Sequence, residues 1–351
     1  MTNFKKIILT GGCGFIGSAM VRKLIQASCF EVLNIDSLTY SGDLQNVESV
    51  SDEDNYRHCK LDIVETERLF EAIDDFKPDA IIHFAAESHV DKSIEDPSSF
   101  IRTNICGTYS LLSASLKYWF NASSKVKKSF RFIHISTDEV FGSLGIGDDP
   151  FTEASPYAPN SPYSASKASS DHLVRAWVNT YGFPGMITNC SNNYGPYQHK
   201  EKLIPKVIFN ALSGAPIPIY GDGLQVRDWL HVNDHIDAIL KILNAGVVGE
   251  SYCIGGNCEI PNLEIIKIIC HELSTILNIQ SNSLIGIEPK NEEELLGLTT
   301  FVEDRLGHDF RYAISTRKVA NELGWIPKID FREGIQETIF WYLRSAGYLR
   351  A

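Results

Sequence analysis

The sequence predicts an α/β fold in which a doubly wound parallel sheet is joined to a smaller, discontinuous C-terminal domain. Short apolar runs alternate with longer amphipathic stretches throughout the first half of the chain. Strands that alternate with helices across short turns are typical of a parallel sheet with helices on both faces. After Cys190 this rhythm changes to turn-rich polar segments between helices. The first half should therefore bind a ligand at the carboxyl ends of its strands.

Each expected element of the first half is a short segment with clear bounds. Strands are predicted at Lys6–Thr10, Glu31–Asp36, Tyr56–Lys60, Ala80–Phe84, Phe130–Ser136 and Met186–Cys190. Helices are predicted at Phe15–Ala27, Thr66–Phe76, Ser98–Tyr118 and Ser164–Tyr181.

In the second half, loops are predicted at Asn192–Tyr197 and Ile217–Gly223. Helices follow at Leu203–Leu212, Asp234–Asn244, Asn262–Leu277 and Glu333–Ser345. We predict that residues 1–190, with about 225–252, form a dinucleotide-binding domain. Residues 191–224 and 253–351 should form a second domain packed closely against it, with a cleft between them.

Composition excludes several classes of partner. The net charge of −12 argues against binding to nucleic acid or to an anionic membrane, and no uninterrupted apolar stretch reaches bilayer length. The apolar run at Ile7–Thr10 is too short for a signal peptide. The eight cysteines form no Cys-x-x-Cys pair, which favours buried free thiols over disulfides or a metal site. We therefore expect a cytoplasmic protein with no bound metal.

A glycine-rich turn follows the first predicted strand. Gly11, Gly12, Gly14 and Gly17 satisfy a G-x-G-x-x-G pattern between a strand and a helix. Such glycines let backbone amides approach a pyrophosphate at the start of the helix. Asp36 ends the second strand, where a carboxylate can accept from both ribose hydroxyls and would repel a 2′-phosphate. The pattern predicts a Rossmann-type domain that binds NAD rather than NADP.

Two further segments fit the same dinucleotide. Asp62 follows the third strand, where a carboxylate can meet an adenine amino group, and Phe84-Ala85-Ala86 follow the fourth, where small residues let a cofactor lie close. A cap at Asp62 and tight packing at Ala85-Ala86 explain the same residues equally well.

Tyr163 and Lys167 lie one helical turn apart on one face. The lysine ammonium and a nicotinamide cation would both favour the phenolate and lower the tyrosine pKa from about 10 toward neutrality. Tyr163 is therefore a candidate base for a hydroxyl that loses its hydride.

Adjacent acids follow a predicted strand at Thr137-Asp138-Glu139. The Thr137 hydroxyl could bind the oxygen that Tyr163 deprotonates. Hydride transfer needs neither acid, whereas elimination needs a base for a carbon acid and an acid for the departing hydroxyl. Two neighbouring carboxyls can differ in protonation because their charges repel. The alternative is a polar loop with a helix-capping aspartate.

These residues resemble the dTDP-glucose 4,6-dehydratases across nearly the whole chain. The matching segments are Thr10–Gly17, Phe84–Asp91, Ser136–Val140, Tyr163–His172, Asn192–Tyr197, Glu201–Pro205, Gly223–Trp229 and Glu303–Asp309. The Thr-Asp-Glu run is the most specific, since related epimerases keep the tyrosine and lysine but lack the acidic pair.

The resemblance implies conversion of dTDP-glucose to dTDP-4-keto-6-deoxyglucose and water, in deoxysugar biosynthesis of the rhamnose type. Tyr163 would act at the C4 hydroxyl, Glu139 would remove the C5 proton and Asp138 would protonate the departing C6 hydroxyl. Thr137 and Lys167 would assist. NAD would be regenerated in each turnover and stay tightly bound.

The resemblance, together with the motifs, assigns binding residues. Those expected to contact NAD are Gly11, Gly14, Phe15, Ile16, Gly17, Asp36, Ser37, Thr39, Asp62, Ile63, Phe84, Ala85, Ala86, Thr103, Tyr163, Lys167 and Asn193. Those expected to contact the nucleoside-diphosphate glucose are Ser88, Thr137, Asn192, Lys202, Leu203, Pro218, Tyr220, Arg227, Asn262, Asp304 and His308. Arg227 is the best phosphate clamp because its planar fork can grip a diphosphate.

Some positions depart from the family pattern. Cys13 stands where alanine is usual, Phe141 replaces a common tyrosine, and Leu306 replaces a common proline near the base pocket. The last change leaves the preference for thymine over uracil open. The resemblance further implies a homodimer joined by the helices near Ser98–Tyr118 and Ser164–Tyr181.

Three alternatives stay open at this point. A UDP-glucose 4,6-dehydratase would use the same residues on another nucleotide. A nucleotide-sugar 4-epimerase would use the Tyr163–Lys167 pair and leave the C6 hydroxyl in place. A redox-sensing regulator would bind NAD without turnover, although such proteins commonly lose the tyrosine that is present here.

Overall fold

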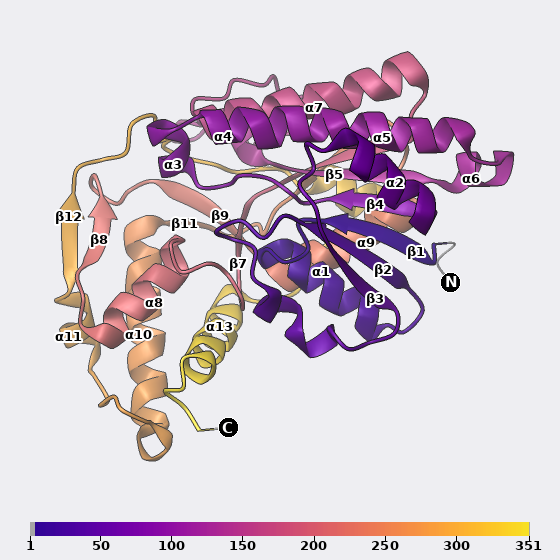
Figure 1. Cartoon of the computed structure of the whole chain (residues 1–351). Helices are drawn as coiled ribbons and strands as arrows, with labels where there is room; N and C mark the ends of the chain where they lie inside the picture. The colour runs from indigo at the N-terminus through magenta and orange to yellow at the C-terminus, as the bar shows by residue number, and fades with distance from the viewer. Residues whose placement is uncertain (1–3, 351) are drawn as a thin grey trace.

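A seven-stranded sheet forms the centre of the larger part of the molecule (Figure 1). The computed structural model describes residues 4–350. The strand order is β10-β6-β5-β4-β1-β2-β3, and every neighbouring pair is parallel. The strands are β1 Lys6–Thr10, β2 Glu31–Asp36, β3 Tyr56–Lys60, β4 Ala80–His83, β5 Arg131–Thr137, β6 Gly185–Cys190 and β10 Ser251–Ile254. The predicted doubly wound α/β fold is confirmed.

Helices cover both faces of this sheet. Side chains alternate between the faces along a strand, so Ile7 of β1 lies in one apolar core and Ile8 in another. Helices α1 (Phe15–Gln26) and α9 (Val232–Ala245) pack in the first core. The second core contains side chains of α2 (Thr66–Phe76), α5 (Thr108–Asn121) and α7 (Pro162–Tyr181).

Shorter helical segments connect these elements. They are η1 Leu44–Val50, α3 Val90–Glu95, α4 Ser98–Phe100, α6 Ser124–Ser129 and η3 Asp138–Phe141.

The stretch predicted as one helix at Ser98–Tyr118 is not a continuous α-helix. Between α4 and α5 the chain forms a π-helical segment, η2, at Ile101–Gly107. Asn104 exchanges two hydrogen bonds with the backbone of Glu87, at 2.8 and 3.0 Å. π-Helical turns frequently occur at functional sites, and this one carries Thr103. The spacing of apolar residues in this stretch is that of an ordinary helix, so the sequence does not predict the π-helical turn.

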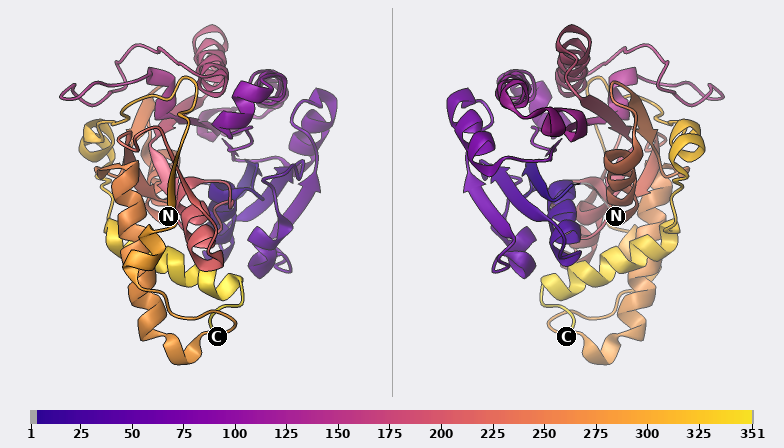
Figure 2. Two further views of the ribbon diagram at one scale, coloured as in Figure 1. Left: turned by 90° about the vertical axis from the view of Figure 1, so that its left-hand side faces the viewer. Right: turned by 90° about the vertical axis from the view of Figure 1, so that its right-hand side faces the viewer.

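The smaller part has its own apolar core, built mainly from α8 (Leu203–Ser213), α10 (Asn262–Ile279) and α13 (Phe331–Ser345). Figure 2 shows the orange and yellow helices of this part gathered at one end of the molecule. Its strands are β7 Asn192–Tyr194, β8 Ile217–Tyr220, β9 Val226–His231, β11 Glu259–Pro261 and β12 Thr299–Val302. Its remaining helices are η4 Ser281–Ser283 and α11 Glu292–Leu296, whereas α12 Arg317–Leu323 packs against the core of the larger part.

Two segments predicted as loops contain strands. β7 lies within Asn192–Tyr197 and pairs with β9, whereas β8 lies within Ile217–Gly223 and pairs with β12. Both pairings are parallel and join segments distant in sequence. Parallel strands are not joined by a hairpin turn, so the local sequence contains no turn signal for these pairs and predicts a loop instead.

The chain passes between the two parts several times. β10 closes the edge of the large sheet, and Trp325, directly after α12, packs in the core that contains α1 and α9. The domain division at residues 1–190 and about 225–252 stays a prediction. Within residues 4–350, no helix combines the length and apolar character needed to cross a bilayer.

Candidate active site

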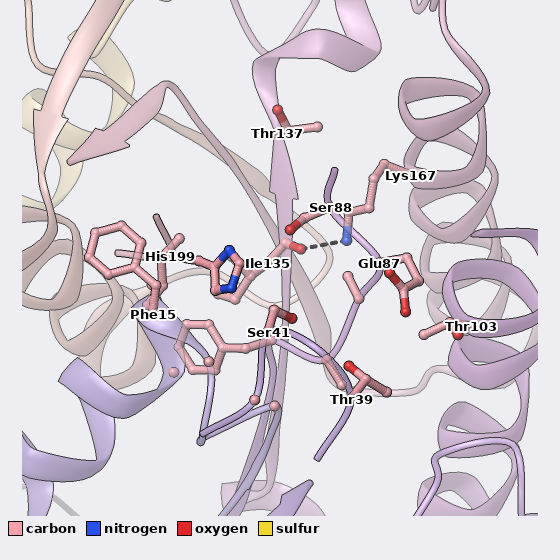
Figure 3. Close-up of a pocket in the computed structure, with 18 of the residues that line it drawn as sticks. Phe15, Thr39, Ser41, Glu87, Ser88, Thr103, Ile135, Thr137, Lys167 and His199 are labelled. Carbon is pink, nitrogen blue, oxygen red and sulfur yellow. Dashed lines mark hydrogen bonds between the residues drawn. The ribbon is translucent and has the colours of Figure 1, made fainter. Parts of the chain in front are cut away.

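A cavity of about 410 Å³ opens at the carboxyl ends of the parallel strands (Figure 3). The ends of β1, β2, β4, β5 and β6 all contribute to its wall, as expected for this class of sheet. The residues predicted to contact the cofactor and to carry the chemistry all line it: Gly11, Gly14, Phe15, Ile16, Gly17, Asp36, Ser37, Thr39, Asp62, Ile63, Phe84, Ala85, Ala86, Thr103, Thr137, Asp138, Glu139, Tyr163, Lys167 and Asn193.

The glycine turn forms a floor in which Gly11 and Gly17 leave no room for a side chain. Gly11 has a φ of +73°, and a Cβ there would lie 2.6 Å from the Ala85 nitrogen. A Cβ on Gly17 would lie 2.2 Å from the Gly11 carbonyl oxygen. Gly14 is the N-cap of α1 and supplies no capping side chain, so the first amides of the helix are left for an anionic ligand. This cradle fits the pyrophosphate of a dinucleotide.

Asp36 is held in place to meet a ribose. Its carboxylate accepts hydrogen bonds from the Cys13 amide at 2.9 Å and from the Leu38 amide at 2.8 Å. The side chain is buried at the end of β2 and lines the cavity. A phosphate on the neighbouring ribose hydroxyl would face this carboxylate directly, which favours NAD over NADP.

Asp62 and Ala85 satisfy both interpretations that the sequence left open. Asp62 lines the cavity, yet its carboxylate also caps the Val64 amide at 3.1 Å and accepts from Arg102 at 2.9 Å. Ala85 lines the cavity and also packs closely against Gly11.

The adjacent acids face the cavity rather than solvent. Thr137 ends β5, and its hydroxyl accepts from the Glu139 amide at 3.3 Å as the N-cap of η3. Asp138 is 1% exposed, and one of its carboxyl oxygens, Oδ2, has no hydrogen-bond partner within residues 4–350. The capping group is therefore Thr137, which leaves the two carboxyls for chemistry.

The two acids differ in their electrostatic surroundings. Burial, with the nearby charges of Glu139 and Asp228, raises the pKa of Asp138 well above its usual range. Burial also raises the pKa of Glu139, but the Arg305, Arg227 and Lys202 cations oppose that rise. Asp138 is thus the better proton donor and Glu139 the better base.

The lowering of the Tyr163 pKa is predicted for a phenol beside both Lys167 and a nicotinamide cation and stays a prediction; in the protein by itself the pKa moves in the opposite direction. Burial raises that pKa well above its ordinary value, and Glu139, Cys190 and Asp138 raise it further. The sequence could not show how many acids surround the phenol. A nicotinamide cation beside Tyr163 would offset this effect.

Lys167 follows Tyr163 by one turn of α7 and binds the backbone of the interior strand β5. Its Nζ donates to the Ile135 carbonyl oxygen at 2.7 Å, drawn as a dashed line in Figure 3. Burial lowers its pKa to about 8.

The predicted substrate residues separate into two groups. Ser88, Thr137, Asn192 and Lys202 line the cavity, and the Lys202 ammonium donates to the Ser88 carbonyl oxygen at 2.8 Å. The others lie outside its wall, in the smaller part of the molecule: Leu203, Pro218, Tyr220, Arg227, Asn262, Asp304 and His308. Among these, the His308 Nδ1 and the Asp304 carboxylate are hydrogen-bonded at 2.6 Å.

Arg227 is less open than the sequence suggested. Its guanidinium donates to the carbonyl oxygens of Val226, Asp309 and Phe310 at 2.7, 2.9 and 3.3 Å. It also stacks on Tyr312, with 4.4 Å to the ring centroid. Because a guanidinium has about five N–H donors, part of its fork remains available to a phosphate.

Several wall residues escaped the sequence analysis. Glu87 and Glu201 lie within the matching segments Phe84–Asp91 and Glu201–Pro205, so their charge was a usable signal. His199 also lines the cavity, but nothing local distinguishes it from a surface histidine. These side chains approach one another because His199 and His89 both contact the Glu201 carboxylate, at 3.6 and 3.4 Å.

The fold and the cavity define a dinucleotide-dependent enzyme of the short-chain dehydrogenase type, with an added pair of acids. A family model described as GDP-mannose 4,6 dehydratase matches residues 8–338. The dTDP-glucose 4,6-dehydratase of Neisseria meningitidis serogroup B is 51% identical over 339 residues, which cover 97% of this chain and 93% of that protein. The chain belongs to the dTDP-glucose 4,6-dehydratase family.

Solved structures agree with this assignment. The crystal structure of DesIV, the dTDP-glucose 4,6-dehydratase of Streptomyces venezuelae with NAD and TYD bound, superposes with a TM-score of 0.85. It is 40% identical, and the match covers 97% of this chain and 98% of that one. A UDP-glucose 4-epimerase from Thermotoga maritima superposes almost as well, with a TM-score of 0.81 at 25% identity and coverage of 97% and 99%. The fold therefore does not separate the two activities.

The glycine cradle makes a prediction about cofactor content. Gly17→Ala should lose most bound NAD, because its Cβ would collide with the Gly11 carbonyl oxygen. Gly14→Ala should retain more, since the nearest atom to its Cβ would be 3.4 Å away. The ratio of NAD to protein in the purified samples measures this. Equal retention in both variants would contradict the cradle.

Proposed function

We propose that this protein removes water from dTDP-glucose and yields dTDP-4-keto-6-deoxyglucose. The observation that carries the proposal is the buried Asp138–Glu139 pair, which shares one cavity with Tyr163 and Lys167. NAD, when bound, accepts the C4 hydride of the sugar and later returns it at C6. As NAD is regenerated in each turnover, the enzyme is a hydro-lyase and not a net oxidoreductase.

Tyr163 takes the proton of the C4 hydroxyl. Thr137 ends β5 in the same cavity, where its hydroxyl can donate to the sugar oxygen. Lys167 supplies positive charge behind the phenol. These groups prepare a ketone at C4, which makes the neighbouring C5–H acidic.

Elimination then uses the two acids in different roles. Glu139 removes the C5 proton, while Asp138 gives its proton to the departing C6 hydroxyl. When hydride is returned to C6, Glu139 gives its proton back to C5, which completes the 4-keto-6-deoxy sugar. The opposite electrostatic surroundings of these carboxyls support this division of labour. An epimerase has no step that requires the pair.

The remaining polar residues are proposed to hold the nucleotide. Ser88, Asn192 and Lys202 lie in the cavity wall beside the sugar and diphosphate region. Leu203, Pro218, Tyr220, Arg227, Asn262, Asp304 and His308 would complete the nucleotide side. Leu306 is 75% exposed.

The first test concerns the substrate. Purified protein incubated with dTDP-glucose should give a product that has lost one water, and UDP-glucose should react more slowly. Mass spectrometry of both mixtures measures this. A product of unchanged mass with an inverted C4 centre would identify an epimerase, and no reaction with either sugar would favour an NAD-binding regulator.

The second test concerns the acids. Asp138→Asn and Glu139→Gln should slow dehydration by about 10²–10⁴-fold, as expected for loss of a general acid or base. Oxidation at C4, followed in a single turnover by absorbance of the reduced cofactor, should change much less. The exposed Asp149→Asn is the matched control. Equal loss of both steps would contradict these roles.

We propose that the protein is a homodimer joined through α5 and α7. Large apolar side chains remain exposed on or beside these helices: Ile101 (47%), Tyr109 (51%), Phe120 (50%) and Tyr181 (43%). The Tyr109 ring lies edge-on to Trp177 at 6.0 Å, which links the two helices. Such a patch is unusual on a monomer.

A charge introduced on the surface of α5 tests the proposed dimer. Tyr109→Asp should shift the sedimentation coefficient from dimer to monomer, because a carboxylate would be buried without a partner. Ile146 is 89% exposed and lies in a loop outside these helices, so Ile146→Asp should leave the sedimentation coefficient unchanged. A monomeric wild-type protein would overturn the proposal.

We also infer cytoplasmic residence and no nucleic-acid or membrane partner. All eight cysteines are free, as suits a reducing compartment, and the net charge is −12. We retain the domain division at residues 1–190 with about 225–252, against 191–224 and 253–351, as a proposal.

A further inference from the structure

A buried ionic cluster lies behind the proposed catalytic lysine. Asp171 follows Lys167 by one turn on α7, so both side chains lie on the same face of the helix. His134 of β5 stands between them, with its Nε2 at 3.4 Å from the Lys167 Nζ and 3.2 Å from the Asp171 Oδ1. The side chains of His134 and Asp171 are fully buried.

Hydrogen bonds hold Asp171 as a carboxylate. Its Oδ2 accepts from the hydroxyls of Ser136 and Tyr157, both at 2.8 Å, and from the Asn189 amide at 3.3 Å. Arg175 donates to the Tyr157 hydroxyl at 2.8 Å and thereby fixes that donor. Burial by itself would raise the pKa of Asp171, but His134, Lys167 and Tyr157 lower it below its usual value.

His134 itself carries no charge at neutral pH. Burial and the Lys167 ammonium hold its pKa at about 4. Its Nδ1 has no hydrogen-bond partner within residues 4–350. The imidazole is therefore a neutral group that contacts both Asp171 and Lys167, and it does not supply a counter-charge to the ammonium.

Other titratable groups face Lys167 from neighbouring elements. Those whose charges interact with Lys167 are Asp171 on α7, His83 on β4, His134 on β5 and Cys190 on β6, while Tyr163 on α7 and Asp138 on η3 line the same cavity as Lys167. Burial raises the pKa of the Cys190 thiol to about 12 and that of the Asp138 carboxyl well above normal, and it lowers the pKa of His83. Within this set, Asp171 is the group that is negatively charged at neutral pH.

We propose that Asp171, acting with His134, is a positioning residue that keeps the Lys167 ammonium charged and in place in the wall of the cavity that it shares with Tyr163. A buried ammonium without a counter-charge would lose its proton or move toward solvent. The inference rests on the proposed function, since Lys167 matters for turnover only if Tyr163 is the base. Asp171 does not line the cavity and so is not itself a catalytic residue.

The test is a pH profile of turnover with dTDP-glucose. Asp171→Asn keeps the shape but removes the charge, so Lys167 should deprotonate at lower pH. The alkaline limb of the profile, where activity falls as pH rises, should shift to lower pH by at least ~1 unit, which is a tenfold loss of activity at a given pH on that limb. At pH 6.5 the same variant should keep a third or more of wild-type activity.

Tyr157→Phe is the matched control, because it removes one hydrogen bond to Asp171 and leaves the charge. Its alkaline limb should stay where it is in the wild type. A loss in Asp171→Asn that is uniform across pH, or an equal limb shift in both variants, would overturn the inference. An inactive wild type would instead refute the proposed function.

A second measurement does not depend on activity. Lys167→Met should lower the melting temperature, because it leaves the buried Asp171 carboxylate without its neighbouring cation. Adding Asp171→Asn to Lys167→Met should recover part of that loss, as neighbouring charges in one network are not additive. Melting temperatures that fall by the sum of the two single losses would show that the residues are not coupled, even if Asp171→Asn alone is too unstable to assay.

Discussion

The balance of buried charge at the carboxyl end of β5 constrains the whole site. Asp138 and Glu139 lie where burial makes ionisation costly, so each depends on the cations and donors that surround it. A site in water could tolerate almost any arrangement of these groups. In the interior, one misplaced charge would change which acid holds the proton.

The fold meets this constraint by drawing cations from the smaller part of the molecule. Arg227 comes from β9, Lys202 immediately precedes α8, and Arg305 follows β12. The acids therefore acquire their working surroundings only when the smaller part packs over the strand ends. This dependence explains why the chain crosses between the two parts and returns.

In the proposed mechanism, a short segment separates elimination from simple oxidation and reduction. The cofactor cradle, Tyr163 and Lys167 would suffice for reversible hydride transfer at C4. The turn η3 adds two carboxyls within the same cavity, and we propose that these make a second reaction possible without altering the sheet. Function in this fold is thus set by a few side chains at one strand end.

Local patterns in the sequence determined the strands and helices of the larger part, the glycine cradle, and the identities of Asp36, Tyr163 and Lys167, because period and turn chemistry are encoded by near neighbours. Only the tertiary structure decided what depends on distant contacts. Strands β7 and β8 form in segments that resemble loops, and the helix around Asn104 contains a π-helical turn. Backbone carbonyl oxygens occupy much of the Arg227 guanidinium, and acids around Tyr163 raise the pKa of its phenol. Hydrogen bonds and charges act between groups close in space, and a linear sequence does not give those distances.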